Sequence, residues 1–197
     1  MIGLDKFKEY FMGYQDQYVL IGGAACDIIF EEQDTAFRAT KDLDLVLIVE
    51  ALTPAFGHRF WQFVRDGGYE HRAKSSGAPQ FYRFDKPKAP GFPYMLELFS
   101  RAGDAFASEN IGPCVPLPLG DELSSLSAIL LNEEYYGMLL KGRTVLSDIA
   151  VLSHTYLIPF KAKAWLDLRE KKAQGYHVDE KDIRKHKNDV LRLSTLL

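Results

Sequence analysis

The chain has 197 residues, 47% of them hydrophobic, which is enough for one sizeable core and a small appended subdomain. The net charge of −3 gives no overall sign of nucleic-acid binding, although residues 161–197 are basic, with ten Lys and Arg against six Asp and Glu. Two cysteines, Cys26 and Cys114, are too few for a disulfide framework and predict buried thiols in a reducing compartment. Neither a signal peptide nor a membrane-spanning stretch is found, so we expect a cytoplasmic protein with no membrane partner.

The first hundred residues alternate between helix and strand patterns. In chain order we expect a helix over 3–14, a strand over 18–23, a helix over 24–30, a strand over 42–50 and a helix that begins at Pro54 with Thr53 as its N-cap. The segments 79–86 and 93–100 flank the turn-rich stretch PKAPGF, which predicts a β-hairpin.

The pattern changes after this hairpin. The stretch GPCVPLPL is too rich in proline for a central strand, whereas LSAILL and YYGMLLKGRTVL are two candidate strands. Helical periodicity begins near Pro159, and a second helix is expected from Asp179 to the end. These patterns divide the chain into an α/β body over 1–155 and a helical subdomain over 156–197 packed on it.

Two glycines, Gly22 and Gly23, stand between the first expected strand and the helix that follows it. A turn of this kind can present backbone N–H groups at a helix N-terminus, where phosphate binds. The pattern lacks the third glycine of the dinucleotide fingerprint and the Gly-Lys-Ser/Thr of the P-loop. A tight packing turn is therefore an open alternative, and a dinucleotide-binding oxidoreductase is disfavoured.

Three carboxylates lie in strand-like stretches. Asp42 and Asp44 are two apart at the start of an apolar strand, so they point to the same side. Carboxylate oxygens suit Mg²⁺, which binds through one or two carboxylates together with substrate phosphates. The alternative is the solvated face of an edge strand, although the run LVLIVE is too apolar for an edge. Glu97 lies among apolar residues and needs either a metal or a basic partner such as an arginine.

Basic and acidic residues of the tail fall into two groups. Lys161 lies inside the apolar stripe of its predicted helix, whereas Lys163 lies on the polar side. An inward lysine either meets an anion or extends to the rim of the apolar surface. Asp182, His186 and Asp189 form an i, i+4, i+7 row, which is typical either of acid–base chemistry or of a solvated helix edge.

The order of these features, Gly-Gly, a helix, an Asp-x-Asp strand and a later strand with a single carboxylate, is similar to that of the polymerase-beta-like nucleotidyltransferases. The chain resembles in particular the AbiEii-type abortive-infection nucleotidyltransferases of toxin–antitoxin systems, through IGGAA, RATKDLDLVL, LELFS, FKAKAW and KHKNDVLRL. One departure is the separation of Gly23 from Asp42 by eighteen residues, which is longer than usual. The resemblance implies an α+β fold, with a nucleotidyltransferase-like mixed β-sheet flanked by helices and a C-terminal helical pair.

The resemblance also implies an activity, the transfer of a nucleoside monophosphate from a nucleoside triphosphate to a hydroxyl acceptor. The sequence leaves open whether the acceptor is an RNA, a protein or a small molecule. Asp42, Asp44 and Glu97 are then the catalytic residues and the ligands of two Mg²⁺ ions. The nucleotide-binding residues implied are Gly22, Gly23, Arg38, Lys41, Lys161 and Asp189. Such a protein can be the toxin of a toxin–antitoxin pair with an antitoxin protein as its partner. The alternative is a non-catalytic nucleotide-sensing or protein-binding module that retains the fold.

Overall fold

The structure is a computed structural model that describes residues 1–71, 81–99 and 133–197. Its described residues form two compact units, the first from residues 1–71, 81–99 and 144–151 and the second from residues 133–143 and 152–197. The expected division placed residues 133–142 in the body, whereas the compact units place them with the C-terminal helices. The stretches GPCVPLPL and LSAILL, and with them Cys114, lie outside the described residues.

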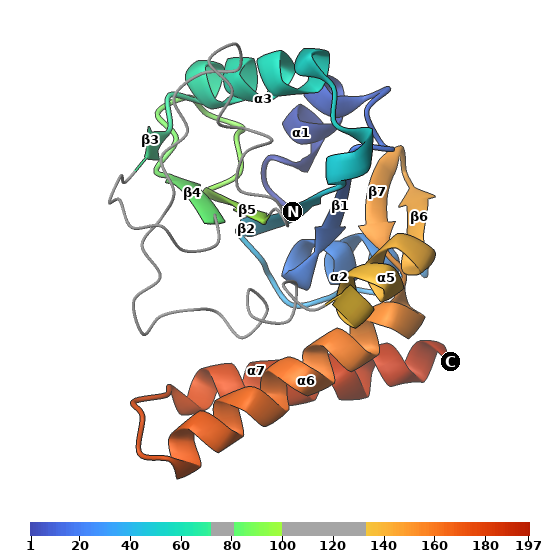
Figure 1. The fold of residues 1–197 in the computed structure, drawn as a ribbon, viewed down its shortest axis with the longest axis vertical. Coiled ribbons are helices and arrows are strands. Elements are labelled where there is room, and N and C mark those ends of the chain that lie inside the picture. The colour runs from blue at the N-terminus through green and yellow to red at the C-terminus, as the bar shows by residue number, and fades with distance from the viewer. Residues whose placement is uncertain (72–80, 100–132) are drawn as a thin grey trace. The chain divides into compact units, whose positions relative to one another are not determined.

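The described strands form one mixed sheet in the order β3-β4-β5-β2-β1-β7-β6 (Figure 1). Their bounds are β1 (Tyr18–Ile21), β2 (Asp42–Leu47), β3 (Glu70–His71), β4 (Phe81–Asp85), β5 (Met95–Phe99), β6 (Arg143–Leu146) and β7 (Ile149–Leu152). Strand β2 runs antiparallel to β1 and parallel to β5, and β4 runs antiparallel to β5 as a hairpin. Because β2 has a neighbour on both sides, the prediction that it is not an edge strand is confirmed.

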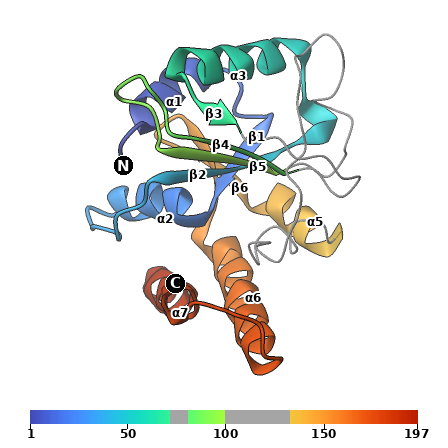
Figure 2. The same ribbon diagram turned by 90° about the vertical axis from the view of Figure 1, so that its left-hand side faces the viewer.

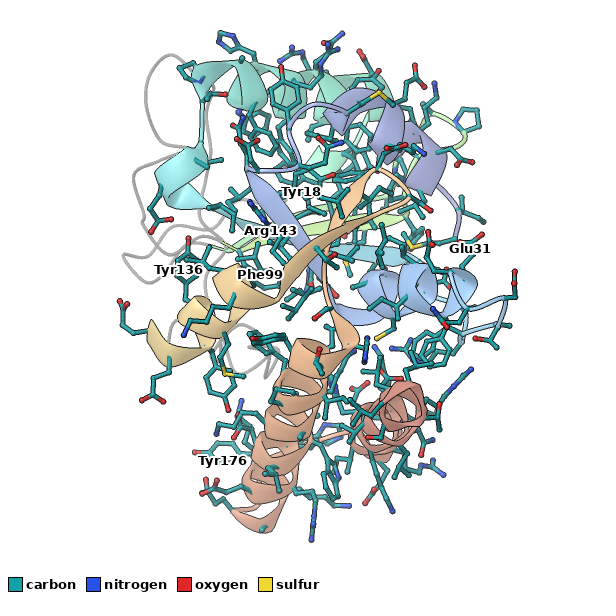
Figure 3. The ribbon with its side chains drawn as sticks, turned by 90° about the vertical axis from the view of Figure 1, so that its right-hand side faces the viewer. Tyr18, Glu31, Phe99, Tyr136, Arg143 and Tyr176 are labelled. Atoms are coloured by element: carbon teal, nitrogen blue, oxygen red, sulfur yellow. The ribbon has the colours of Figure 1, made fainter. Side chains whose placement is uncertain are left out.

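Helices cover both faces of this sheet within the first unit. Helices α1 (Leu4–Phe11) and α3 (Pro54–Gly67) lie on one face, and α2 (Gly22–Glu31) lies on the other (Figure 2). The face that α1 and α3 cover carries an aromatic core. In this core the ring centroids of Phe7 and Tyr18 are 5.2 Å apart, and those of Phe11 and Phe63 are 5.5 Å apart. Tyr18, which is labelled in Figure 3, is fully buried. This burial holds β1 and the glycine turn after it in place.

Helix α3 begins and ends as its sequence predicts. The Thr53 hydroxyl accepts a hydrogen bond from the Phe56 backbone N–H at 3.2 Å, and Pro54 is the first helical residue. Gly68 follows the helix with φ at 60°, a left-handed conformation that glycine adopts without strain. A short 3₁₀ helix, η1 (Val49–Ala51), connects β2 to this N-cap.

The second unit contains α5 (Glu133–Gly142), α6 (His154–Ala173), α7 (Glu180–Leu193) and the 3₁₀ helix η2 (Ser194–Leu196). Helix α6 packs against α7. Asp179 caps α7, accepting a hydrogen bond from the Lys181 backbone N–H at 2.8 Å. In the described part of the chain, no helix combines the length and the apolar character that crossing a membrane requires.

Two predictions for this part of the chain are wrong. The expected strand YYGMLLKGRTVL is helical as far as Gly142, and only Arg143–Leu146 forms a strand. Two glutamates in the first turn favour the N-terminus of a helix, and Tyr136 and Leu139 are buried three residues apart on one helical face. Helix α6 begins at His154 rather than near Pro159, because a proline close to the start of a helix disrupts few backbone hydrogen bonds.

Candidate functional site

Asp42, Asp44 and Glu97 lie on two neighbouring parallel strands. In the register of β2 and β5, Asp44 is the Cα partner of Glu97, and Asp42 is the partner of Met95. Neighbouring strands lie about 4.8 Å apart, and residues two apart on a strand point to the same side. The three half-buried carboxylates therefore share one face of the sheet, with Asp44 and Glu97 side by side. The strand positions predicted for these residues are the ones observed.

Glu97 has a basic partner on the next strand. Arg83 of β4 is its Cα partner in the antiparallel hairpin. The guanidinium donates from Nε to Oε1 of Glu97 at 2.8 Å, and its Nη2 forms an ion pair with the same oxygen at 2.5 Å. The side chain of Glu97 is 16% exposed and that of Arg83 is 44% exposed. The requirement of Glu97 for a cation is thus met by an arginine in this structure, which was one of the two alternatives left open by the sequence.

The glycine turn meets the acidic strand directly. Helix α2 begins at Gly22, immediately after β1, and Gly22 has a φ of 68°. A Cβ atom at this position would overlap Oδ2 of Asp44 and lie 2.9 Å from its Cγ. The carboxylate of Asp44 thus lies against the first turn of α2, where the partial positive charge of the helix N-terminus stabilises an anion. Glycine at position 22 is required both by the left-handed backbone and by this close approach.

The second glycine contacts the segment that leads into β2. A Cβ atom at Gly23 would lie 2.7 Å from Oγ1 of Thr40 and 3.3 Å from Nη2 of Arg38. The guanidinium of Arg38 also lies 5.2 Å from the ring centroid of Phe37. The structure therefore brings Arg38 and Thr40 to the glycine turn.

Lys41 has a different environment. Its side chain is exposed, and its ammonium lies 5.9 Å from the ring centroid of Tyr94.

Sequence reasoning did not single out Thr40 or Arg83. The position of Thr40, two residues before Asp42, could have indicated that it lies near the acidic strand. The pairing of Arg83 with Glu97 could not be predicted in this way, because it depends on the register of β4 and β5.

Lys161 and Asp189, the two tail residues implied by the resemblance, bind each other within the second unit. The ammonium of Lys161 donates to Oδ2 of Asp189 at 3.0 Å, and their side chains are 2% and 1% exposed. The prediction that the Lys161 side chain is buried is confirmed, and the anion that it meets is a carboxylate of the same unit. Lys163 is 43% exposed and pairs with Asp167 one turn along the same helix, which raises the pKa of Lys163.

The row formed by Asp182, His186 and Asp189 is not a solvated helix edge along its whole length. Asp182 is exposed, whereas His186 is 9% exposed and Asp189 is 1% exposed. The solvated-edge interpretation is therefore wrong for His186 and Asp189. Helix α7 turns this part of the row toward the buried side, together with Ile183.

The chemistry of the acidic face fits a hard divalent cation. Carboxylate oxygens are the ligands that Mg²⁺ prefers, and strand register places three carboxylates on one face. Within residues 1–71, 81–99 and 133–197, however, no group of three or more His, Cys, Asp or Glu side chains is arranged to hold a metal ion. Both contacts of Arg83 go to Oε1 of Glu97. Complete ligation by Glu97 would therefore require it to exchange the guanidinium for the cation.

The comparison with solved structures finds chains of similar structure. The crystal structure of the lincosamide antibiotic adenylyltransferase LnuA, bound to lincomycin, aligns with 99% of this chain and 96% of its own chain, at a TM-score of 0.49 and 14% sequence identity. No family model matches the chain, and no curated protein matches it. At this level of similarity the alignment does not assign an activity to the chain.

Proposed function

We propose that this chain is a magnesium-dependent nucleotidyltransferase. It would move a nucleoside monophosphate from a nucleoside triphosphate to a hydroxyl acceptor. The observation that supports the proposal is the placement of Asp42, Asp44 and Glu97 on one face of β2 and β5, with Asp44 against the first turn of α2. Carboxylate oxygens are the ligands that Mg²⁺ prefers, and this face offers them from two neighbouring strands.

The residues around the carboxylates have distinct roles in this proposal. The backbone N–H groups at Gly22 and Gly23 bind phosphate at the start of α2, and the guanidinium of Arg38 lies beside them. When bound to the three carboxylates, two Mg²⁺ ions would supply a clamp on the attacking and leaving oxygens of an in-line displacement. The acceptor oxygen forms a bond to the α-phosphorus, and pyrophosphate leaves.

The remaining nucleotide-binding assignments rest on the resemblance. Lys41 is exposed and able to reach a phosphate from the loop before β2. The roles of Lys161 and Asp189 rest on the resemblance alone, and in the structure the two side chains bind each other within the second unit. An RNA or a protein supplies the acceptor hydroxyl in this proposal. A role as the toxin of a toxin–antitoxin pair, with an antitoxin protein as partner, is part of the same proposal.

A second candidate function is a nucleotide-sensing module without turnover. The contact that favours it is the pairing of Glu97 with Arg83, because a carboxylate that binds a guanidinium is not available as a full ligand of a second cation. Two carboxylates suffice to hold one Mg²⁺ together with a triphosphate. Transfer of label from the nucleotide to an acceptor distinguishes the enzyme from this module.

The test uses the double variant Asp42→Asn/Asp44→Asn. The melting temperature of the wild type should rise when Mg²⁺ and nucleotide are added together. In a cell extract, a labelled nucleotide should become attached to an acceptor. The double variant should lose both responses while its melting temperature without metal is unchanged or higher, because charge repulsion is relieved. Asp5→Asn, an exposed change in the first turn of α1, is the control. An undiminished metal response in the double variant would exclude the metal assignment.

A further inference from the structure

We propose that Arg83 competes with a divalent cation for Glu97, so that the acidic face binds the cation weakly alone and tightly together with a triphosphate. The inference deepens the proposed function and rests on it, since that function makes the acidic face a cation site. Arg83 acts through Glu97 and is therefore a positioning residue.

The first observation is a row of charges across three strands. Arg83 of β4 is the Cα partner of Glu97 of β5, and Glu97 is the partner of Asp44 of β2. In-register neighbours point to the same face, so the guanidinium, the two carboxylates and Asp42 stand on one surface. The four side chains carry a formal charge of −3 from the acids and +1 from the arginine. The guanidinium therefore already supplies part of the positive charge that a cation would supply.

The second observation is where the guanidinium binds. Nε donates to Oε1 of Glu97 and Nη2 forms an ion pair with the same oxygen, and charge-assisted bonds of this kind are the stronger hydrogen bonds of proteins. A cation that takes Glu97 as a full ligand must displace or share this oxygen. A guanidinium beside the site also repels a divalent cation, and at about 5 Å in water this repulsion corresponds to roughly tenfold in affinity.

The third observation is the difference in exposure between the partners. The side chain of Glu97 is 16% exposed, whereas that of Arg83 is 44% exposed. Arg83 can therefore leave the pair by rotation of its side chain, and Glu97 stays on the face of the sheet. A triphosphate offers the departing guanidinium phosphate oxygens, which it binds in a bidentate manner. Arrival of the nucleotide would free Glu97 and add ligands for the cation in one event.

The experiment measures Mn²⁺ affinity, by electron paramagnetic resonance, with and without a non-hydrolysable nucleoside triphosphate. Arg83→Met and Arg83→Gln both remove the charge and should bind free Mn²⁺ about tenfold more tightly than wild type. The increase in Mn²⁺ affinity that the nucleotide causes should shrink in both variants. Arg83→Lys retains the charge and should stay close to wild type.

The matched control is Lys86→Met, which removes one positive charge just beyond the end of β4. Lys86 pairs with Glu70 at 3.6 Å, and no described contact links it to the acidic face. It should change Mn²⁺ affinity by less than about twofold. Unchanged or weaker binding of free Mn²⁺ in either charge-removing variant would overturn the role of Arg83. If Asp42→Asn/Asp44→Asn binds Mn²⁺ as well as wild type does, the proposed function fails instead.

Discussion

The carboxylate of Asp44 fills the space in which a side chain at position 22 would stand. Gly22 has a φ of 68°, and a Cβ atom there would overlap Oδ2 of Asp44. The glycine turn and the acidic strand are therefore one structural unit, although twenty-one residues separate the two positions. A substitution at Gly22 tests both the backbone conformation and the position of the carboxylate.

Gly22→Ala should destabilise the protein more than Gly13→Ala. Gly13 has a φ of 87°, and no atom lies within 4 Å of the place of a Cβ atom. Alanine at position 13 should therefore lower the unfolding free energy only by the strain of a left-handed backbone, about 1–2 kcal/mol. At Gly22 the overlap with Asp44 adds about 1–3 kcal/mol. Urea denaturation of both variants measures the difference. Equal losses would show that Asp44 moves away without cost and that only the backbone requires glycine.

Lys161→Met should destabilise the second unit strongly. Asp189 is 1% exposed, and removal of the ammonium beside it is expected to cost about 3–5 kcal/mol in unfolding free energy. Lys163→Met is the control, because that side chain is 43% exposed and its pair within one helix contributes about 0.3–0.5 kcal/mol.

The double variant Lys161→Met/Asp189→Leu separates burial of a charge from loss of packing. Replacement of a buried ion pair by apolar side chains of similar volume is often neutral, so much of the loss should be recovered. Denaturant unfolding of the single and double variants gives the coupling energy. A single variant as stable as Lys163→Met would show that the pair contributes nothing to folding.

The unfolding free energy should fall as the pH rises above 10, in part through Tyr10. The Tyr10 hydroxyl donates to Oδ2 of Asp66 at 2.6 Å, and this bond raises the pKa of Tyr10 from 10.0 to about 12. A pKa raised in the folded state stabilises the protein below pH 10, and this contribution is lost as the pH rises through the folded pKa. Burial also raises the pKa of Tyr18 and that of Tyr69, so these residues contribute to the same loss of stability at high pH.

Tyr10→Phe isolates this contribution. The cost of the substitution in unfolding free energy should be larger at about pH 9 than at about pH 12, because wild type loses the neutral phenol over that interval. Denaturant unfolding of both proteins at the two pH values measures it. A cost that is the same at both would mean that the bond to Asp66 does not shift the titration of Tyr10.

Much of the first unit could be predicted from periodicity. The two-residue alternation around Asp42 and Asp44 predicted a strand, and Thr53 followed by Pro54 predicted the start of α3. Both signals are local, since a strand alternates its faces and a cap bonds a backbone group three residues away. The strand β7 was not predicted, because IAVL is a short apolar run whose parallel partner, β1, is far away in sequence.

Part of the candidate site could also be predicted from local sequence patterns, and part could not. By itself the sequence determined that Asp42 and Asp44 share a face and that Lys161 is buried. It placed Gly22 and Gly23 before the helix, whereas the structure makes them the first two residues of α2. Only the tertiary structure decided that Asp44 stands beside Glu97 and against Gly22, and that Arg83 binds Glu97. The physical reason is register, because a shift of one residue in strand pairing would turn each of these side chains to the other face. That register depends on packing between segments distant in the chain, which a local pattern does not contain.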